Sequence, residues 1–466
     1  MNEPPQRLTG PGGPWKLLAA AILVVLLFNA ALYFAIHSRE AKLRADLQSR
    51  GFKFSLHELA ASHIEPSPEL NELGEAVREL QRLNFWRLGG GFRLMNLGPS
   101  GTPIPAVKAD KPFGAVNDPG DNLFNRTWED LAEAARQAQP ALQRIRALAR
   151  QRIPYGRLGN SPTFDSINVA QALCADALSA LRQGSGEAAL QDLESLTDFA
   201  LISSGEQNLI IQIGRSAVIH ISVKTCWEML QSNEWTEPQL RRMEAAWERV
   251  LPLPVVERAA EGEVAGLEEV RSELRKELAK APLRERAGAL VGLMDEGWDI
   301  QFSLEYFLAY WEAARALERG ENWSVFRPGL ETLKSRANTQ LHSRYRHLEL
   351  RYCLPHFDAT FETCAGNEAA RQLLLTDIAL RRFKLHHNGA LPKTLRELTP
   401  EFLAPASGHD VFGGGDLQYR ANPDGSYLLY SVGRDGTDDG GDASWGSGQT
   451  PFWDSRDMAW PSPAQR

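Results

Sequence analysis

The residues best suited to metal chemistry lie near the C-terminus, where aspartates alternate with glycines over residues 435–457. Calcium binds about six to eight oxygen atoms, several from carboxylates and several from backbone carbonyls of the kind that glycine-rich turns expose. The spacing of an EF-hand is absent, so the pattern predicts another kind of calcium loop, and a solvated acidic turn without an ion is the alternative. The predicted metal ligands are Asp435, Asp438, Asp439, Asp454 and Asp457.

A second group of ligand-type residues lies in the segment RHLELRYCLPHFDATFETC, residues 346–364. Cys353 and His356 have the spacing of half a zinc site, but the second short pair that a structural zinc requires is missing, so ordinary helical residues are favoured. On one continuous helix Cys353 and Cys364 would stand about 16 Å apart, too far for a disulfide. The sequence leaves open the redox state of its cysteines, which are Cys174, Cys226, Cys353 and Cys364.

Local catalytic motifs are absent from the chain. His57 and Glu58 begin like the helix of a zinc protease, but no histidine stands four residues after His57, and His63 falls on another face. The sequence contains no phosphate-binding loop, no dinucleotide-binding glycine motif after a strand and no nucleophile elbow. We therefore predict no catalytic residue and no enzyme from the motifs, although acid–base pairs assembled from distant segments leave no local trace.

The composition excludes several classes of protein. The chain has 466 residues, of which 43% are hydrophobic and 24% charged, with four cysteines and a net charge of −8. This apolar content excludes a disordered chain, and the few cysteines exclude a small disulfide scaffold. Because the net charge is negative and no long basic block occurs, we expect no nucleic-acid partner. Most of the negative charge lies after residue 400, which indicates a separate C-terminal unit.

An apolar run from Leu17 to Ile36 contains no charged residue. Twenty residues in a helix span about 30 Å, the thickness of the hydrocarbon core of a bilayer. A cleaved signal peptide is the alternative, but the run is long for a signal core and no small-x-small cleavage site follows it. We therefore predict an uncleaved transmembrane helix at residues 17–36, with the lipid bilayer as its partner. The flanking charges do not decide the orientation.

The rest of the chain has mainly helical periodicity, and we expect an α-helical bundle or an irregular array of helical hairpins. A helix is expected from residue 37 to a break at Pro66, then another after Ser67, then a Gly- and Pro-rich loop. Thr127 and Thr236 are expected to cap helices, and a helical hairpin is expected around Gly184. The segment 209–223 has the composition of strands, but its helical neighbours favour a buried helix. The expected units are residues 1–16, a short cytoplasmic tail; 17–36, the transmembrane helix; 37–127, juxtamembrane helices and the loop; 128–365, the helical domain; and 366–466, a small α+β domain.

The C-terminal hundred residues contain a helix over 369–387, a stop at Asn388 and Gly389, a short helical turn over 394–398 and two strands over 416–420 and 426–432. Together with the turn YSVGRDG and the acidic loop after it, this pattern resembles the globular domain of the major pseudopilin of bacterial type II secretion systems. The resemblance implies a small antiparallel sheet and a calcium loop in which Asp435 matches the aspartate of the G-x-D-G turn. Asp454 and Asp457 match the later pair with a spacing one residue longer.

Two departures separate this chain from a filament subunit, because the N-terminal methylation segment is absent and a long helical region separates the apolar run from the tail. The chain is therefore similar to membrane-anchored bacterial proteins with a pseudopilin-like end. For such an end the family context implies the non-cytoplasmic side of the inner membrane, which we adopt.

The sequence thus predicts a single-pass anchored extracytoplasmic scaffold with an unidentified protein partner and a calcium loop. A component of a secretion apparatus is the first alternative, and a hydrolase in the helical domain is the second. A concave pocket with two or more buried carboxylates or histidines in the helical body would favour the hydrolase.

Overall fold

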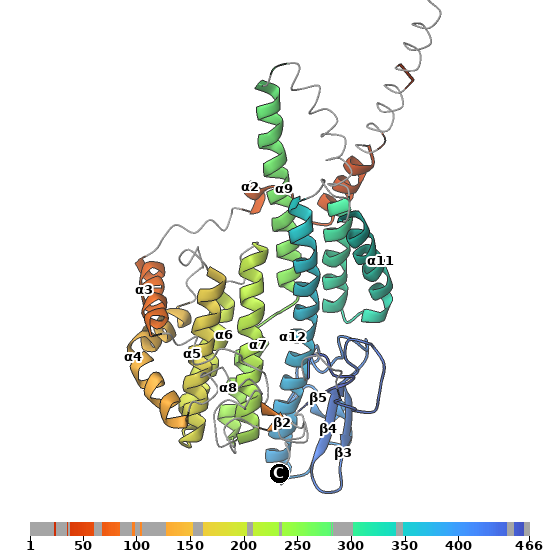
Figure 1. The fold of residues 1–466 in the computed structure, drawn as a ribbon. Coiled ribbons are helices and arrows are strands. Elements are labelled where there is room, and N and C mark those ends of the chain that lie inside the picture. Colours follow the sequence, from red (N-terminus) through yellow and green to blue (C-terminus); the bar gives the residue numbers. More distant parts are fainter. Residues whose placement is uncertain are drawn as a thin grey trace, which may run out of the picture.

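The computed structural model is mainly α-helical, with a small antiparallel sheet near the C-terminus (Figure 1). The named helices are α2 (Leu56–Leu59), α3 (Pro68–Arg82), α4 (Trp128–Arg150), α5 (Pro162–Arg182), α6 (Gly186–Ile202), α7 (Leu209–Ser232), α8 (Glu237–Glu248), α9 (Pro254–Lys280), α11 (Trp323–Leu341) and α12 (Leu348–His386). Two further helices cover residues 38–49 and 302–318. The structure describes residues 23–24, 35, 38–59, 68–83, 96–97, 103–104, 127–151, 162–202, 208–232, 235–280, 282, 302–341, 348–444 and 452–460.

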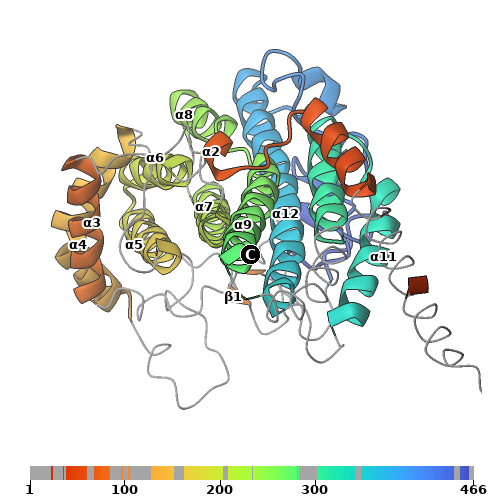
Figure 2. The same ribbon diagram turned by 90° about the horizontal axis from the view of Figure 1, so that it is seen from above.

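Helices α5, α6 and α7 form the centre of the helical body. The predicted hairpin is confirmed, because α5 and α6 are joined by a tight turn in which Gly184 has a φ of +76°. Helix α5 packs on both α6 and α7, and α7 packs on α12, so these helices lie side by side (Figures 1 and 2). Most of α7 is buried around its circumference. The many isoleucines and valines of this internal helix explain its strand-like composition, although α7 also buries the charged residues Arg215, Lys224 and Glu228.

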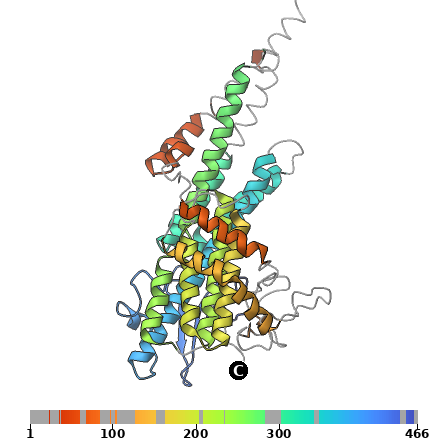
Figure 3. The ribbon, with the colours of Figure 1, turned by 90° about the vertical axis from the view of Figure 1, so that its left-hand side faces the viewer.

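The predicted helix starts at Thr127 and Thr236 are also confirmed, since each threonine forms a capping box with the residue three positions on. The prediction of one helix from residue 37 to Pro66 is wrong. The first helix ends at residue 49, and Gly51 then takes a φ of +91°, which reverses the chain before α2. Helix α9 begins among its neighbours and extends past them at its C-terminal end (Figure 3).

Helix α12 has 39 residues and links the helical body to the C-terminal sheet. It packs on α7 and α8 and also on β4 (Tyr427–Ser431) and β5 (Met458–Trp460). The predicted helix over 369–387 is its second half, and the stop is confirmed, since Asn388 and Gly389 both have a positive φ. The predicted unit boundary after residue 365 falls inside this helix, so the chain has no linker at that point.

The C-terminal sheet has the order β3-β4-β5, with β3 covering Gln418–Ala421. The predicted hairpin is confirmed, with Ala421 opposite Tyr427 next to the turn. Strand β5 was not predicted, and it pairs antiparallel with β4, with Leu429 opposite Trp460. The buried face of the sheet lies against α12, where Asp377 accepts a hydrogen bond from Trp460 Nε1 at 3.2 Å.

Most of the apolar run at residues 17–36 lies outside the described residues, which include only 23, 24 and 35 of it. None of the helices among the described residues is long and apolar enough to cross a membrane. Most of the Gly- and Pro-rich loop also lies outside them. Its described parts are two short paired strands, β1 (Asn96–Leu97) and β2 (Pro103–Ile104).

Candidate functional site

The acidic tail is organised around Asp457, whose side chain is fully buried. Its Oδ2 accepts hydrogen bonds from the backbone N–H groups of Gly441 at 2.7 Å and Asp442 at 3.1 Å, and its Oδ1 accepts one from Asp439 at 3.4 Å. Burial raises the pKa of Asp457, and these backbone bonds act in the opposite direction. The carboxylate of Asp457 therefore holds the glycine-rich turn in place.

The other predicted ligands point to separate protein donors. Asp438 accepts from Tyr430 Oη at 2.9 Å, Asp435 accepts from the backbone N–H of Thr437 at 2.9 Å, and Asp454 pairs with Arg434 at 3.2 Å. Asp439 lies 3.6 Å from Arg456. Among the described residues, no three His, Cys, Asp or Glu side chains are grouped so that they could hold a metal ion. The calcium loop stays a prediction.

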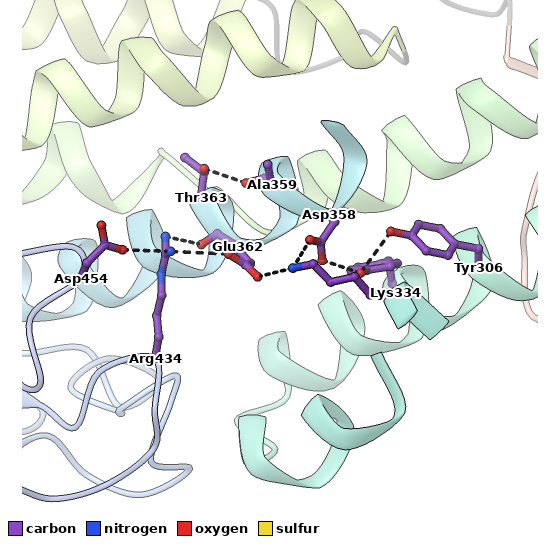
Figure 4. Close-up of polar contacts among 9 residues, drawn as sticks. Tyr306, Lys334, Asp358, Ala359, Glu362, Thr363, Arg434 and Asp454 are labelled. Carbon is purple, nitrogen blue, oxygen red and sulfur yellow. Dashed lines mark hydrogen bonds and ion pairs between the residues drawn. The ribbon is translucent and has the colours of Figure 1, made fainter. Parts of the chain in front are cut away.

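A chain of charged side chains joins the tail to the helical body (Figure 4). Arg434 lies between Asp454 and Glu362 of α12, at 3.2 and 3.5 Å. Glu362 also faces Lys334 of α11 at 3.5 Å, and Lys334 Nζ lies 2.5 Å from Asp358 Oδ2. Asp358 and Glu362 belong to the segment 346–364 and Asp454 to the acidic tail, and the structure brings these two regions into one row of alternating charges.

The inner end of this row is closed by two tyrosines of helix 302–318. Tyr310 Oη donates to Asp358 Oδ1 at 2.5 Å, and Tyr306 Oη donates to Tyr310 Oη at 3.3 Å. Burial raises the pKa of both tyrosines well above the usual range, so both stay neutral donors. On the tail side, the ring of Trp453 stacks on His220 of α7 at 4.3 Å between centroids. The row and the stacked rings fix the C-terminal loops on α7, α11 and α12.

The segment of Cys353 and His356, for which the sequence favours ordinary helical residues, lies in α12, which continues through Pro355 as one helix. Cys364 is a free thiol at 3.2 Å from Ser216 Oγ, and burial raises its pKa to about 11. Cys174 and Cys226 are also free and buried. His347 lies outside the described residues, as does the side chain of Cys353.

The first cavity is a groove of about 940 Å³ between helix 302–318 and α11. Its walls carry two rows at helical spacing, alanines on one helix and larger apolar side chains on the other. Four arginines and two glutamates surround these walls. The apolar rows are Ala309, Ala313, Ala316, Phe326, Leu330 and Leu333.

The second cavity has a volume of about 590 Å³ and lies between α4 and the α5–α6 hairpin. Arg146 of α4 donates through Nε to Asp192 Oδ1 at 2.9 Å, and its Nη2 contacts both Asp192 and Asp176. Gln139 Nε2 donates to Asp176 Oδ2 at 2.8 Å. Burial and the charge of Asp176 raise the pKa of Asp192 to about 8, against the opposing effect of Arg146.

The sequence reasoning missed this cavity. The available signal was Asp192, a charged residue next to the buried positions Leu190 and Leu193 of an otherwise apolar helix face. Its partners come from two other helices, and no local motif reports them. The cavity does collect two buried carboxylates, as the hydrolase alternative requires, but both are bound to one guanidinium.

Comparisons with protein-family models, with curated proteins and with solved structures found no match to this chain. The function must therefore be inferred from the sequence and from the geometry above.

Proposed function

We propose that the protein is a single-pass, membrane-anchored scaffold whose helical body lies outside the cytoplasm and binds another protein. The apolar run at residues 17–36 supports the anchor, since its length matches the hydrocarbon core. The observation that carries the scaffold function is the groove of about 940 Å³ between helix 302–318 and α11, because its two apolar rows match the mode by which grooves accept an amphipathic helix.

The first described helix supports a fixed position of this groove relative to the anchor. Helix 38–49 follows the apolar run directly and is docked on the body by ion pairs with two helices, α9 and helix 302–318. Glu40 lies 3.0 Å from Arg271 of α9, and Arg39 lies 3.5 Å from Glu305 of helix 302–318. Arg50, at the end of helix 38–49, lies 2.5 Å from Glu312 and lines the groove. An anchor at residues 17–36 would therefore hold the groove close to the membrane.

Topology is tested with the full chain. A reporter enzyme that is active only outside the cytoplasm, fused after Arg466, is expected to be active, and the mature mass is expected to include residues 17–36. Activity of a cytoplasm-only reporter at the same position would overturn the orientation. A mature N-terminus near residue 40 would overturn the anchor.

The groove is tested by a photo-cross-linking amino acid placed at Val325, which is 72% exposed and lines the groove. The matched control is Leu385, which is 52% exposed and lies at the end of α12 outside the groove. In native membranes we expect one discrete adduct from Val325 and none from Leu385. The adduct should disappear when Leu330 is changed to Asp, which places a charge on the groove wall. Equal adducts at both positions would contradict the proposal.

Calcium binding by the tail is a second part of the proposal, and it rests on the spacing of aspartates and glycines. A role in a secretion apparatus depends on the resemblance of the tail alone. The hydrolase alternative has one observation in its favour, the pair Asp176 and Asp192. Since both carboxylates are engaged by Arg146, we take the pair as a recognition element instead.

A further inference from the structure

The cavity between α4 and the α5–α6 hairpin has a charge imbalance at its floor. The side chains of Asp192, Asp176 and Arg146 are 2%, 15% and 14% exposed. The two carboxylates therefore share Arg146 as their ion-pair partner, which leaves one of them without a contacting cation of its own when both are ionised. A buried charge without a partner is unfavourable, and a ligand that brings a positive charge removes this penalty.

The hydrogen bonds within this group leave acceptors for such a ligand. Arg146 reaches only Oδ1 of Asp192, through Nε at 2.9 Å and Nη2 at 2.5 Å. Asp176 accepts from Arg146 and Gln139 through Oδ2 only. Among the described residues, Oδ2 of Asp192 and Oδ1 of Asp176 accept no hydrogen bond, and both side chains line the cavity. Asp192 is thus a nearly fully buried carboxylate with one oxygen available to an occupant.

The walls of the cavity suit a peptide better than a bare ion. They carry amides and hydroxyls that can pair with backbone N–H and C=O groups, and about 590 Å³ is within the usual range for a ligand site. Arg136 and Arg150 also line the cavity, and their donors match carbonyl or carboxylate oxygens rather than a cation. The wall residues with amides or hydroxyls are Gln139, Gln143, Ser179, Gln183, Ser185 and Gln191.

We propose that this cavity binds a guanidinium or ammonium side chain of an extended peptide segment, with the cation at Oδ2 of Asp192 and Oδ1 of Asp176, the two oxygens that Arg146 does not reach. This inference rests on the proposed scaffold function and names the chemistry of a second partner contact, separate from the groove at α11. The same chemistry could come from a small free cation, and the experiment below distinguishes the two sources.

Binding is expected to depend on pH. A bound cation favours the ionised form of Asp192, whose pKa burial has raised to about 8, so binding below pH 8 releases a proton. The affinity should therefore increase from pH 6 to pH 8, by up to about tenfold per unit. The ionisable groups that face Asp192 are Arg146 of α4 and Asp176 and Cys174 of α5. Lys224 and Glu228 of α7 act on Cys174 with opposite charges.

The test is isothermal titration calorimetry on the full chain in detergent micelles. The probe is acetyl-Gly-Gly-Arg-Gly-Gly-amide, the neutral control is the same peptide with citrulline in place of arginine, and agmatine is the free guanidinium. We expect the arginine peptide to bind at least tenfold more tightly than the citrulline peptide, and more tightly at pH 8 than at pH 6. Agmatine should bind more weakly than the arginine peptide.

Asp192→Asn should reduce the affinity for the arginine peptide at least tenfold and remove its dependence on pH. Asp198→Asn is the matched control, because Asp198 is also a largely buried aspartate of α6, pairs with Arg249 and lies outside the cavity. If Asp192→Asn fails to fold, Asp176→Asn and the citrulline comparison still decide the matter.

Equal affinity for the arginine and citrulline peptides, or no binding of either, would overturn the proposal. Equal affinity for agmatine and the arginine peptide would contradict the proposal of a peptide ligand. It would indicate a site for a small free cation instead. A negative result here combined with the cross-link at Val325 would leave the scaffold function standing without this contact.

Discussion

Glu40 and Arg271 are 231 positions apart in the chain and form an ion pair of 3.0 Å in which both side chains are only 7% exposed. Arg44 joins the same carboxylate at 3.0 Å. Burial by itself would raise the pKa of Glu40, but the bonds and charges of Arg271 and Arg44 lower it overall. The helix that follows the apolar run is thus attached to the body through a buried charge.

Glu40→Gln should lower the stability of the chain by up to about 3 kcal/mol, because it removes the nearer partner of the buried Arg271 and leaves only Glu268 at 3.7 Å. The stabilisation by wild-type Glu40 is present above its unfolded pKa and is lost as the pH falls through its lower folded value. The measurement is urea unfolding of the full chain in micelles, followed by near-ultraviolet circular dichroism. Glu273→Gln, in an exposed pair on α9, should leave the midpoint unchanged. Equal midpoints for both variants would contradict this account of the pair.

Asp192 should make the protein less stable as the pH rises. A carboxyl group whose folded pKa is about 8, above its unfolded value of about 4, binds more protons in the folded state between these values. Its contribution is therefore greatest below pH 4 and declines until pH 8. We expect the urea midpoint of the wild type to fall more than that of Asp192→Asn between pH 5 and pH 8.5. Parallel profiles would show that Asp192 does not titrate there.

Arg434→Met should loosen the C-terminal loops without unfolding the helices. The substitution leaves Asp454 and Glu362 without their shared cation, and it interrupts the row of charges in Figure 4. Hydrogen exchange of residues 433–444 and 452–457 should become faster, whereas exchange in α7 should be unchanged. Arg456→Met is the control in the same tail, since Arg456 is 61% exposed and its partners lie at 3.6 and 4.0 Å. Slow exchange in both variants would mean that the row does not hold the loops.

Calcium should raise the melting temperature of the full chain by several degrees, since a ligand at a hundred times its dissociation constant contributes about 2.7 kcal/mol. Asp435→Ala should abolish the shift, because Asp435 has the best match to the pseudopilin-like loop. Asp424→Ala, in the hairpin turn, should retain it. Melting is compared in millimolar calcium and in chelator. Identical melting curves of the wild type in calcium and in chelator would contradict calcium binding. The tail would then be an acidic turn stabilised by its backbone N–H groups.

Local patterns were sufficient to predict most helices and one hairpin. The capping threonines, Gly184 and the stop at Asn388 form contacts with residues a few positions away in the chain. Signals of this local kind can be recognised in a single sequence. The break at Gly51 was missed although its signal is local: Gly51 has a positive φ, and the N–H of Phe52 donates back to the carbonyl of Leu47, as at a glycine-terminated helix end. Strand β5 was missed because its three residues gain their hydrogen bonds only from β4, which lies far away in the chain.

The candidate sites were harder to predict for the same reason. The aspartates of the tail were identified from composition, but composition does not show that Asp457 accepts backbone N–H groups or that Asp454 pairs with Arg434. The cavity of Arg146 takes residues from three helices, so no spacing in the sequence indicates it. The unit boundary after residue 365 was placed where the pseudopilin-like pattern begins, and α12 passes through that position without a break.

The length of α12 determines how far the C-terminal sheet lies from the opposite end of the helical body. With 39 residues it measures about 58 Å, nearly twice the thickness of the hydrocarbon core of a bilayer. Because α12 is one continuous helix from the region of helix 302–318 to the C-terminal sheet, its length sets the separation of these two regions. If helix 38–49 lies on the membrane side, the length of α12 fixes the distance between the lipid surface and the C-terminal sheet. A partner bound at the sheet would then be held at that distance from the membrane.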